Sequence, residues 1–186
     1  MIDFLGYCNK ISNLQPEAEA EILASLRTLS LQKGEFLLRK GQICRHIYFI
    51  NSGLLKVISM QNDKEIIMRF FWDELMFTQL KSFSTQQPSD YAIQAIELCE
   101  IMYMPYVEIE RLATKYHCVE TFYRKLLTHA AMVMMERILE MLQETPTQRY
   151  NKFILQNKAI LQRISLGDIA HYLGISQVSL SRIRAK

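Results

Sequence analysis

The sequence predicts an α+β fold that consists of an antiparallel β-roll, a long helix and a C-terminal helix-turn-helix unit. Three observations support this prediction. Residues 35–104 contain short apolar runs separated by turn residues, which is typical of antiparallel β-structure. Residues 118–142 contain neither Gly nor Pro and repeat apolar residues at helical spacing. Residues 165–186 contain two helix-start signals on either side of a glycine, which indicates two short helices joined by a tight turn.

A helix is expected before the roll. Pro16 suits the first helical turn, where its missing N–H costs nothing. Apolar residues then recur at helical spacing at Ile22, Leu23, Leu26 and Leu29. The helix is therefore expected to continue to about Leu29, before Lys33-Gly34-Glu35 interrupts the pattern.

The roll is predicted from five apolar runs and the turns between them. Strands are expected at residues 36–38, 47–50, 54–58, 66–71 and 101–104. Turn signals lie at residues 40–42, 51–53 and 61–64, and residues 85–89 form a polar loop. The close spacing of the runs favours an antiparallel roll or barrel.

The long helix carries a wide apolar face, which must be buried against something. We assign this face to Phe122, Leu126, Ala130, Val133, Met134, Ile138 and Met141. Part of it can cover the roll, and the rest suits a two-fold helix pair in a homodimer. The alternative is a helix that is buried wholly within its own domain. Thr145-Pro146-Thr147 ends the helix and marks the predicted domain boundary.

The C-terminal residues have the geometry of a helix-turn-helix. Ser165 and Asp168 resemble a capping box, and Ile169 and Leu173 give the first helix an apolar face. The small Ala170 lets a second helix pass closely. Gly174 supplies a left-handed turn residue, and Ile175 anchors the turn. Ser176 then caps a second helix, which Leu180 and Ile183 pack against the first.

The second helix is the candidate reader of DNA, because its N-terminal end is polar and unburied in this arrangement. Gln177, Ser179 and Arg182 are expected to contact bases, and Val178 can meet a thymine methyl group. Arg184, Lys186 and the capped helix ends are expected to contact phosphates. The full set of candidate DNA-binding residues is Ser176, Gln177, Val178, Ser179, Ser181, Arg182, Arg184 and Lys186. The alternative is a helical hairpin that serves only packing.

Charge is distributed unevenly along the chain. The net charge is +3, but residues 143–186 carry seven basic and two acidic side chains, which leaves residues 1–142 slightly acidic. A basic C-terminal unit suits a phosphate-facing module. No apolar run is long enough to span a bilayer, and residues 1–4 do not resemble a signal peptide, so a cytoplasmic location is expected. Cys8, Cys44, Cys99 and Cys118 are scattered, which favours free thiols over a metal site and leaves a redox-sensing thiol as an alternative.

These residues resemble the cyclic-AMP receptor protein/Fnr (Crp/Fnr) superfamily of transcription regulators over almost the whole chain. Residues 33–38, 41–42 and 47–57 are similar to the β-roll of its cyclic-nucleotide-binding-like domain, and residues 97–103 resemble its last roll strand. Residues 173–176 and 180–183 resemble its helix-turn-helix. The resemblance implies a homodimer formed through the long helix, a two-fold operator on double-stranded DNA, and RNA polymerase as a further partner. The β-wing that often follows the helix-turn-helix is short or absent in this sequence.

The sequence departs from the nucleotide-binding members of that family. Those members carry a Gly- and Glu-rich cassette followed by Arg-Ser or Arg-Thr, because a cyclic phosphate needs a cation and nearby backbone N–H groups. Here the cassette region, residues 72–79, lacks glycine, and no arginine lies between Phe71 and Glu97. Cyclic AMP is therefore not expected to bind in the family manner. The resemblance places a candidate effector pocket at Glu74, Thr78, Gln86, Gln87 and Phe122.

We therefore expect a DNA-binding transcription regulator whose effector is unknown, with no catalytic residues, metal or cofactor. The expected domains are a sensor at residues 1–117, a dimerisation helix and hinge at 118–145, and a DNA-binding domain at 146–186. No phosphate loop or catalytic motif is present, which argues against an enzyme. The alternative is a ligand-binding or interaction module with a vestigial DNA-binding unit.

Overall fold

Two four-stranded antiparallel sheets form the roll. They are seen in a computed structural model that describes residues 3–61 and 64–185. The first sheet has the order β1 (Arg27–Leu31), β8 (Cys99–Pro105), β3 (His46–Ser52) and β6 (Met76–Phe77). The second has the order β2 (Phe36–Leu38), β7 (Ala92–Ala95), β4 (Leu54–Gln61) and β5 (Lys64–Trp72). The predicted fold class is confirmed, and each of the five predicted strands is present.

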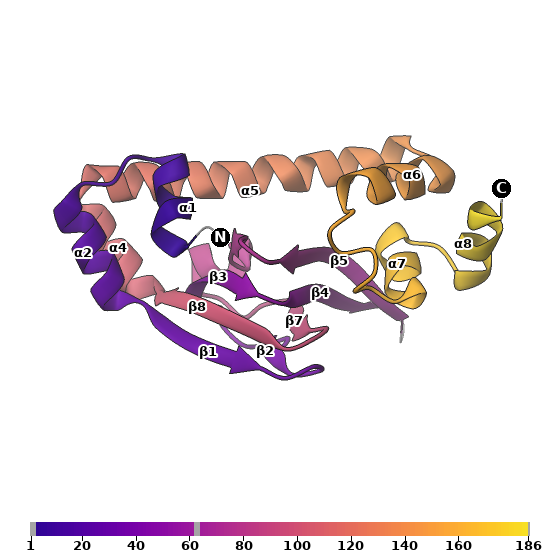
Figure 1. The fold of residues 1–186 in the computed structure, drawn as a ribbon, viewed down its shortest axis with the longest axis horizontal. Coiled ribbons are helices and arrows are strands. Elements are labelled where there is room, and N and C mark those ends of the chain that lie inside the picture. The colour runs from indigo at the N-terminus through magenta and orange to yellow at the C-terminus, as the bar shows by residue number, and fades with distance from the viewer. Residues whose placement is uncertain (1–2, 62–63, 186) are drawn as a thin grey trace.

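Helices flank the roll and extend beyond it (Figure 1). α1 (Phe4–Ile11), α2 (Pro16–Ser25) and α4 (Tyr106–Lys115) lie at one end, and α3 (Leu80–Thr85) joins β6 to β7. α5 (His117–Gln143) runs along the length of the molecule. α6 (Pro146–Gln156), α7 (Leu166–Leu173) and α8 (Gln177–Arg184) gather at the other end, beside β4 and β5. The helix-turn-helix is therefore placed far from α2 and close to the roll's second sheet.

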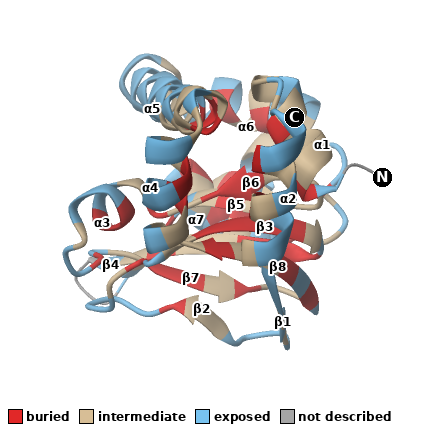
Figure 2. Cartoon of the chain, turned by 90° about the vertical axis from the view of Figure 1, so that its left-hand side faces the viewer, coloured by how far each residue is buried: buried red, intermediate tan, exposed pale blue. Residues whose placement is uncertain are grey.

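The core of the roll lies between the two sheets and under the first half of α5. Phe49, Ile50 and Ile101 are fully buried there, and Phe122 and Leu126 of α5 close it from above. Figure 2 shows this distribution, with buried residues along the strands and exposed residues over much of α5. The first half of α5 is thus held by apolar burial against the roll.

A second core lies on the outer face of the β4–β5 sheet. Leu54, Ile58, Ile67 and Phe70 are buried there against residues of the helix-turn-helix unit. The inward-facing residue of β4, Leu55, belongs to the first core instead. Both faces of this sheet are therefore covered, one by the roll and the other by the C-terminal helices.

The apolar residues of α5 are divided between a part buried on the roll and an exposed part. Phe122 and Leu126 are buried, whereas Met134, Ile138 and Met141 are 42–51% exposed. This division agrees with the prediction that only part of the face covers the roll, and it arises because a straight helix turns its apolar residues gradually away from one partner. An exposed row with steps of three and four residues consists of Thr128, Ala131, Met135, Ile138 and Leu142.

The first predicted helix was too long. α2 ends at Ser25, and Leu29 lies in β1, where it pairs with Ile101 of β8. The helical spacing of Leu26 and Leu29 was misleading because pairing with β8 decides the conformation of this segment. α1, β1, β6 and β7 were not predicted. β6 is only two residues long, too short for a periodic signal.

Candidate nucleic-acid interface

A tight turn at Gly174 sets the angle between α7 and α8. Gly174 has φ +69° and ψ 35°, a left-handed conformation that glycine adopts without steric cost. Beyond it, the Ile175 N–H donates to the carbonyl of Ala170 at 3.0 Å. Ala170 and Leu173 of α7 are completely buried, as is Leu180 of α8 at 1% exposure. These are the packing positions that the sequence predicts for a helix-turn-helix.

Serine caps begin both helices. The Ser165 hydroxyl accepts the Asp168 N–H at 3.0 Å, and the Ser176 hydroxyl accepts the Ser179 N–H at 3.1 Å. The Asp168 carboxylate accepts from the Ser165 hydroxyl and also from Lys56 of β4, at 2.9 Å. A capping box in which both reciprocal bonds form occurs instead at Thr145 and Gln148, where α6 begins. The residues that break α5 therefore also start the next helix.

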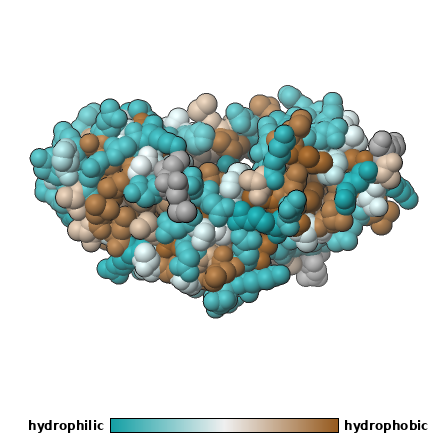
Figure 3. All heavy atoms as spheres, in the orientation of Figure 1, coloured by the Kyte–Doolittle hydropathy of each residue, from teal (hydrophilic) through white to brown (hydrophobic). Residues whose placement is uncertain are grey.

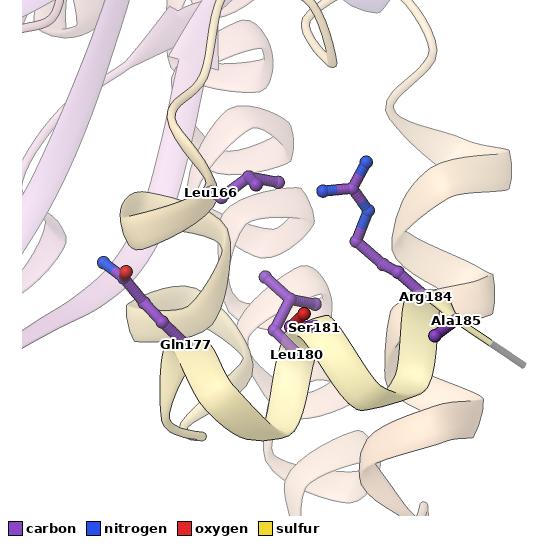
Figure 4. Close-up of a pocket in the computed structure, with 6 residues that line it drawn as sticks. All are labelled: Leu166, Gln177, Leu180, Ser181, Arg184 and Ala185. Atoms are coloured by element: carbon purple, nitrogen blue, oxygen red, sulfur yellow. The ribbon is translucent and has the colours of Figure 1, made fainter.

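The residues predicted to contact DNA occupy two sides of α8. Gln177, Leu180 and Arg184 project toward α7 and, with Leu166, Ser181 and Ala185, line a surface hollow (Figure 4). Gln177 lies against Gly167, because a Cβ built on that glycine would stand 2.7 Å from the Gln177 Nε2. Val178 and Arg182, one turn apart, are exposed, with 62% of Val178 accessible. The N-cap Ser176 and the partly buried Ser179 stand at the start of the same helix.

Three of the seven C-terminal basic residues are engaged within the molecule. Arg149 donates to the carbonyls of Glu144 and Leu173, Lys152 pairs with Glu140 and Glu144, and Arg163 pairs with two roll carboxylates. Over the described residues, Lys158, Arg182 and Arg184 form no ion pair. The basic charge available to phosphates is therefore smaller than the sequence indicates. Lys186 lies outside the described residues.

Arg149 is a structural residue of this unit that the sequence analysis missed. It is only 9% exposed and binds the carbonyl of Leu173 at 3.0 Å, at the C-terminal end of α7. A guanidinium in this position satisfies a carbonyl that the helix leaves without a partner. Its spacing from Leu173 gives no local signal, since the two residues belong to different helices.

Comparison with known proteins places this geometry in a family. The family model of the cyclic nucleotide-binding domain matches residues 28–116. The transcriptional activator protein Anr of Pseudomonas protegens is 23% identical over 164 residues, which cover 82% of this chain and 67% of the relative. FixK2 from Bradyrhizobium japonicum superposes with a TM-score of 0.74 at 18% identity, over 86% of this chain and 83% of that one.

A transcriptional regulator of the crp/fnr family from Eubacterium rectale superposes with a TM-score of 0.73 at 19% identity, over 92% of this chain and 82% of that one. Residues 28–116 match a cyclic nucleotide-binding domain, and the chain shares the fold of these Crp/Fnr structures. The roll corresponds to the matched cyclic nucleotide-binding domain, and α7 and α8 form the helix-turn-helix that follows it.

The predicted effector positions are spread over several elements. Thr78 donates to the carbonyl of His46 at 2.8 Å, and the Gln86 side chain donates to the carbonyl of Phe83 at 2.7 Å. The carbonyl of Gln87 accepts from the Ser82 hydroxyl, and Phe122 is buried in the first core. Glu74 lies in the turn after β5 with φ +62°. Both described pockets lie away from these five positions, so the effector pocket stays a prediction.

The interior of the roll is filled by aromatic side chains near those positions. Phe71 and Phe77 stack with ring centroids 4.2 Å apart, and Tyr48 stacks on Phe77 at 5.4 Å. Burial of the Tyr48 phenol raises its pKa far above the usual range. Cys8, Cys44 and Cys99 are buried free thiols, and Cys118 is partly exposed. Burial raises the pKa of the Cys99 thiol to about 11, which keeps it protonated and weakly nucleophilic.

Within the part of the chain that the structure describes, no group of three His, Cys, Asp or Glu side chains is placed to hold a metal ion. In the same residues no helix combines the length and apolarity needed to cross a membrane.

Proposed function

We propose that this chain is a transcription regulator that binds a two-fold site on double-stranded DNA as a homodimer, with α8 as its recognition helix. The observation that carries the proposal is the division of α8. Leu180 anchors the helix in the core, while Val178 and Arg182 stand exposed at its other side. An N-terminal helix end with polar and apolar groups free to meet base edges is what major-groove recognition requires. Anr, a relative of this chain, is a transcriptional activator by name.

The homodimer is proposed from the exposed row on α5. Met135, Ile138 and Leu142 are 58, 51 and 77% exposed and repeat with steps of three and four residues. This spacing keeps one apolar seam facing a parallel partner helix. A second copy of α5 covers that seam and places two α8 helices at the same end of the dimer, about 34–36 Å apart on DNA.

The division of labour follows from this arrangement. Residues 1–117 form the sensor, 118–145 the dimerisation helix and hinge, and 146–186 the DNA-binding domain. We assign no catalytic role, and we place the protein in the cytoplasm with RNA polymerase as a further partner. The effector is unknown, and cyclic AMP is not expected to bind in the family manner, because the resemblance places Gln86 and Gln87 where nucleotide-binding members carry an arginine. Micromolar binding of cyclic AMP in calorimetry would contradict this assignment.

The test is selection of duplexes from a random DNA library with the purified protein, followed by anisotropy titration of the best sequence. We expect a two-fold sequence, bound with an affinity that falls steeply as salt rises, because phosphate contacts release counterions. An Arg182→Ala variant gives the matched comparison. Failure to enrich any duplex would support the second candidate, an interaction module with a vestigial DNA-binding unit.

A further inference from the structure

The helix-turn-helix unit completes its core with residues of its own roll. Phe70 of β5 lies 6.2 Å from Phe153 of α6 and 5.4 Å from Tyr172 of α7, measured between ring centroids. Phe153 and Tyr172 also contact each other, at 5.0 Å. Figure 3 shows hydrophobic residues gathered on the molecular face over α6 and α7. The unit is therefore packed against the sensor, rather than joined to it only by the chain.

An arginine locks the segment between α6 and α7 to two turns of the roll. Arg163 reaches Asp73, after β5, at 2.5 Å and Glu97, before β8, at 2.5 Å. Asp73 also accepts the Gly53 N–H at 2.7 Å, which fixes the carboxylate in place. The pKa of Asp73 is lowered, because the bonds from Arg163 and Gly53 outweigh the opposing effect of burial. One guanidinium thus holds two roll loops that are far apart in sequence.

A second ion pair joins α7 itself to the sheet. Lys56 of β4 donates to Asp168 of α7 at 2.9 Å and to Glu65 of β5 at 2.7 Å. The Lys56 side chain is 14% exposed and that of Asp168 is 17% exposed, so solvent screens this pair only in part. We call these two sets of ion pairs the clasp. One set joins Arg163 to Asp73 and Glu97, and the other joins Lys56 to Asp168 and Glu65.

The clasp leaves the recognition helix free. Val178, Ser181 and Arg182 are exposed while α7 is docked on β4 and β5. The docked arrangement therefore does not hide the surface that would meet DNA. It fixes the direction in which α8 points relative to α5, and hence relative to the second recognition helix of a dimer.

We propose that the clasp is a positioning device, which holds each DNA-binding unit on its own roll so that the two α8 helices of a dimer match one spacing of DNA half-sites. The inference rests on the proposed function and deepens it. An undocked unit samples many orientations, and only the fraction in the matching one can bind both half-sites. The apparent Kd for a two-half-site duplex therefore rises in inverse proportion to the docked fraction. Binding of one unit to one half-site does not depend on that fraction.

The experiment compares the wild-type chain with Arg163→Gln and with Asp73→Asn/Glu97→Gln. Asn at position 73 keeps an acceptor for the Gly53 N–H, so the roll turn is preserved. Lys81→Gln is the control, since Lys81 pairs with Asp90 in an exposed ion pair elsewhere on the roll. Circular dichroism checks that each variant is folded. The fluorescence of Trp72, the only tryptophan, reports docking because its ring packs against the second core.

Three duplexes are titrated: the two-fold sequence selected from the random library, a single half-site, and the two-fold sequence with one base pair added between half-sites. Both clasp variants should shift the Trp72 emission to the red and weaken binding to the selected duplex roughly tenfold, as the docked fraction falls. Binding to the half-site should stay unchanged, and the penalty for the added base pair should shrink. Lys81→Gln should behave as wild type.

Two results overturn the inference while leaving the proposed function intact. One is an unchanged affinity of the clasp variants for the selected duplex, and the other is an equal loss on the full site and the half-site. A wild-type protein that binds none of the duplexes refutes the proposed function, and the inference fails with it.

Discussion

Replacement of Gly53 by alanine should destabilise the protein far more than the same change at Gly41. Gly53 has φ +116°, and a Cβ at this position would stand 2.6 Å from the Cys99 Sγ, 2.7 Å from the Cys99 Cα and 2.8 Å from the carbonyl oxygen of Leu98. Two of these three atoms belong to the backbone where β8 begins and cannot move without disturbing the strand. Gly41 has φ +86°, with no atom within 4 Å of such a Cβ.

The two variants separate two contributions to the loss of stability: the strained backbone conformation of an alanine and the steric overlap of its Cβ. A left-handed backbone costs an alanine about 1–2 kcal/mol at Gly41, and at least as much at Gly53, whose φ lies further from the left-handed well. Overpacking adds about 1–3 kcal/mol, and this second cost applies to Gly53 alone. Gly53→Ala should therefore lose about 2–5 kcal/mol of the free energy of unfolding, against about 1–2 kcal/mol for Gly41→Ala. Urea unfolding followed by Trp72 fluorescence measures both, and equal losses would refute the reasoning from contact.

Three further predictions concern the DNA interface, the clasp and the dimer. Arg182→Ala should weaken specific DNA binding by roughly 1–3 kcal/mol in anisotropy titrations, and Lys33→Ala, in the turn between β1 and β2, is the control. An unchanged affinity would remove Arg182 from the interface. Asp168→Asn should lower stability at pH 7 by about 1 kcal/mol, because bonds from Ser165 and Lys56 outweigh burial and lower the pKa of this carboxyl. Stability from a lowered carboxyl pKa is present above the unfolded value, near 3.8, and is lost as the pH falls through the folded value. The difference in free energy of unfolding between wild type and Asp168→Asn should therefore disappear below pH 3.8 in urea titrations. A difference that persists there would show that it does not come from the ion pair. Ile138→Glu should shift the protein toward monomers in sedimentation velocity. Gln143→Glu, which adds a charge beside the seam, should not. A dimer that survives Ile138→Glu would exclude this face of α5 as the dimer interface.

The helix-turn-helix was predictable because its signals are local. Gly174, Ser165 and Ser176 each act within four residues, through a backbone conformation or a cap, and all three behave as expected in the structure. The roll strands were predictable for the same reason, since their apolar runs and turns alternate along the chain. β1 was predicted wrongly although Leu29 and Leu31 alternate with Thr28 and Ser30, a period of two that competes with the helical spacing.

The clasp was not predictable from local patterns. Arg163 and Glu97 are 66 residues apart, and Lys56 and Asp168 are 112 residues apart. One signal in the sequence does bear on docking. Leu54-Leu55 and Phe70-Phe71 place apolar residues on both faces of adjacent strands, whereas an antiparallel sheet with one solvated face alternates apolar and polar residues. Such a sheet needs a cover on its outside, although the sequence does not identify α6 and α7 as that cover.

The docked position of α7 also protects the sheet from unwanted association. β5 is the outermost strand of its sheet, with β4 as its only strand neighbour among the described residues. A strand at a sheet edge offers unpaired N–H and C=O groups to any other extended chain, and the danger is greatest when its side chains are apolar. With α7 lifted away, Ile67 and Phe70 would be exposed along this edge. Docking of the C-terminal helices thus keeps apolar side chains of an edge strand covered, in addition to fixing the direction of α8.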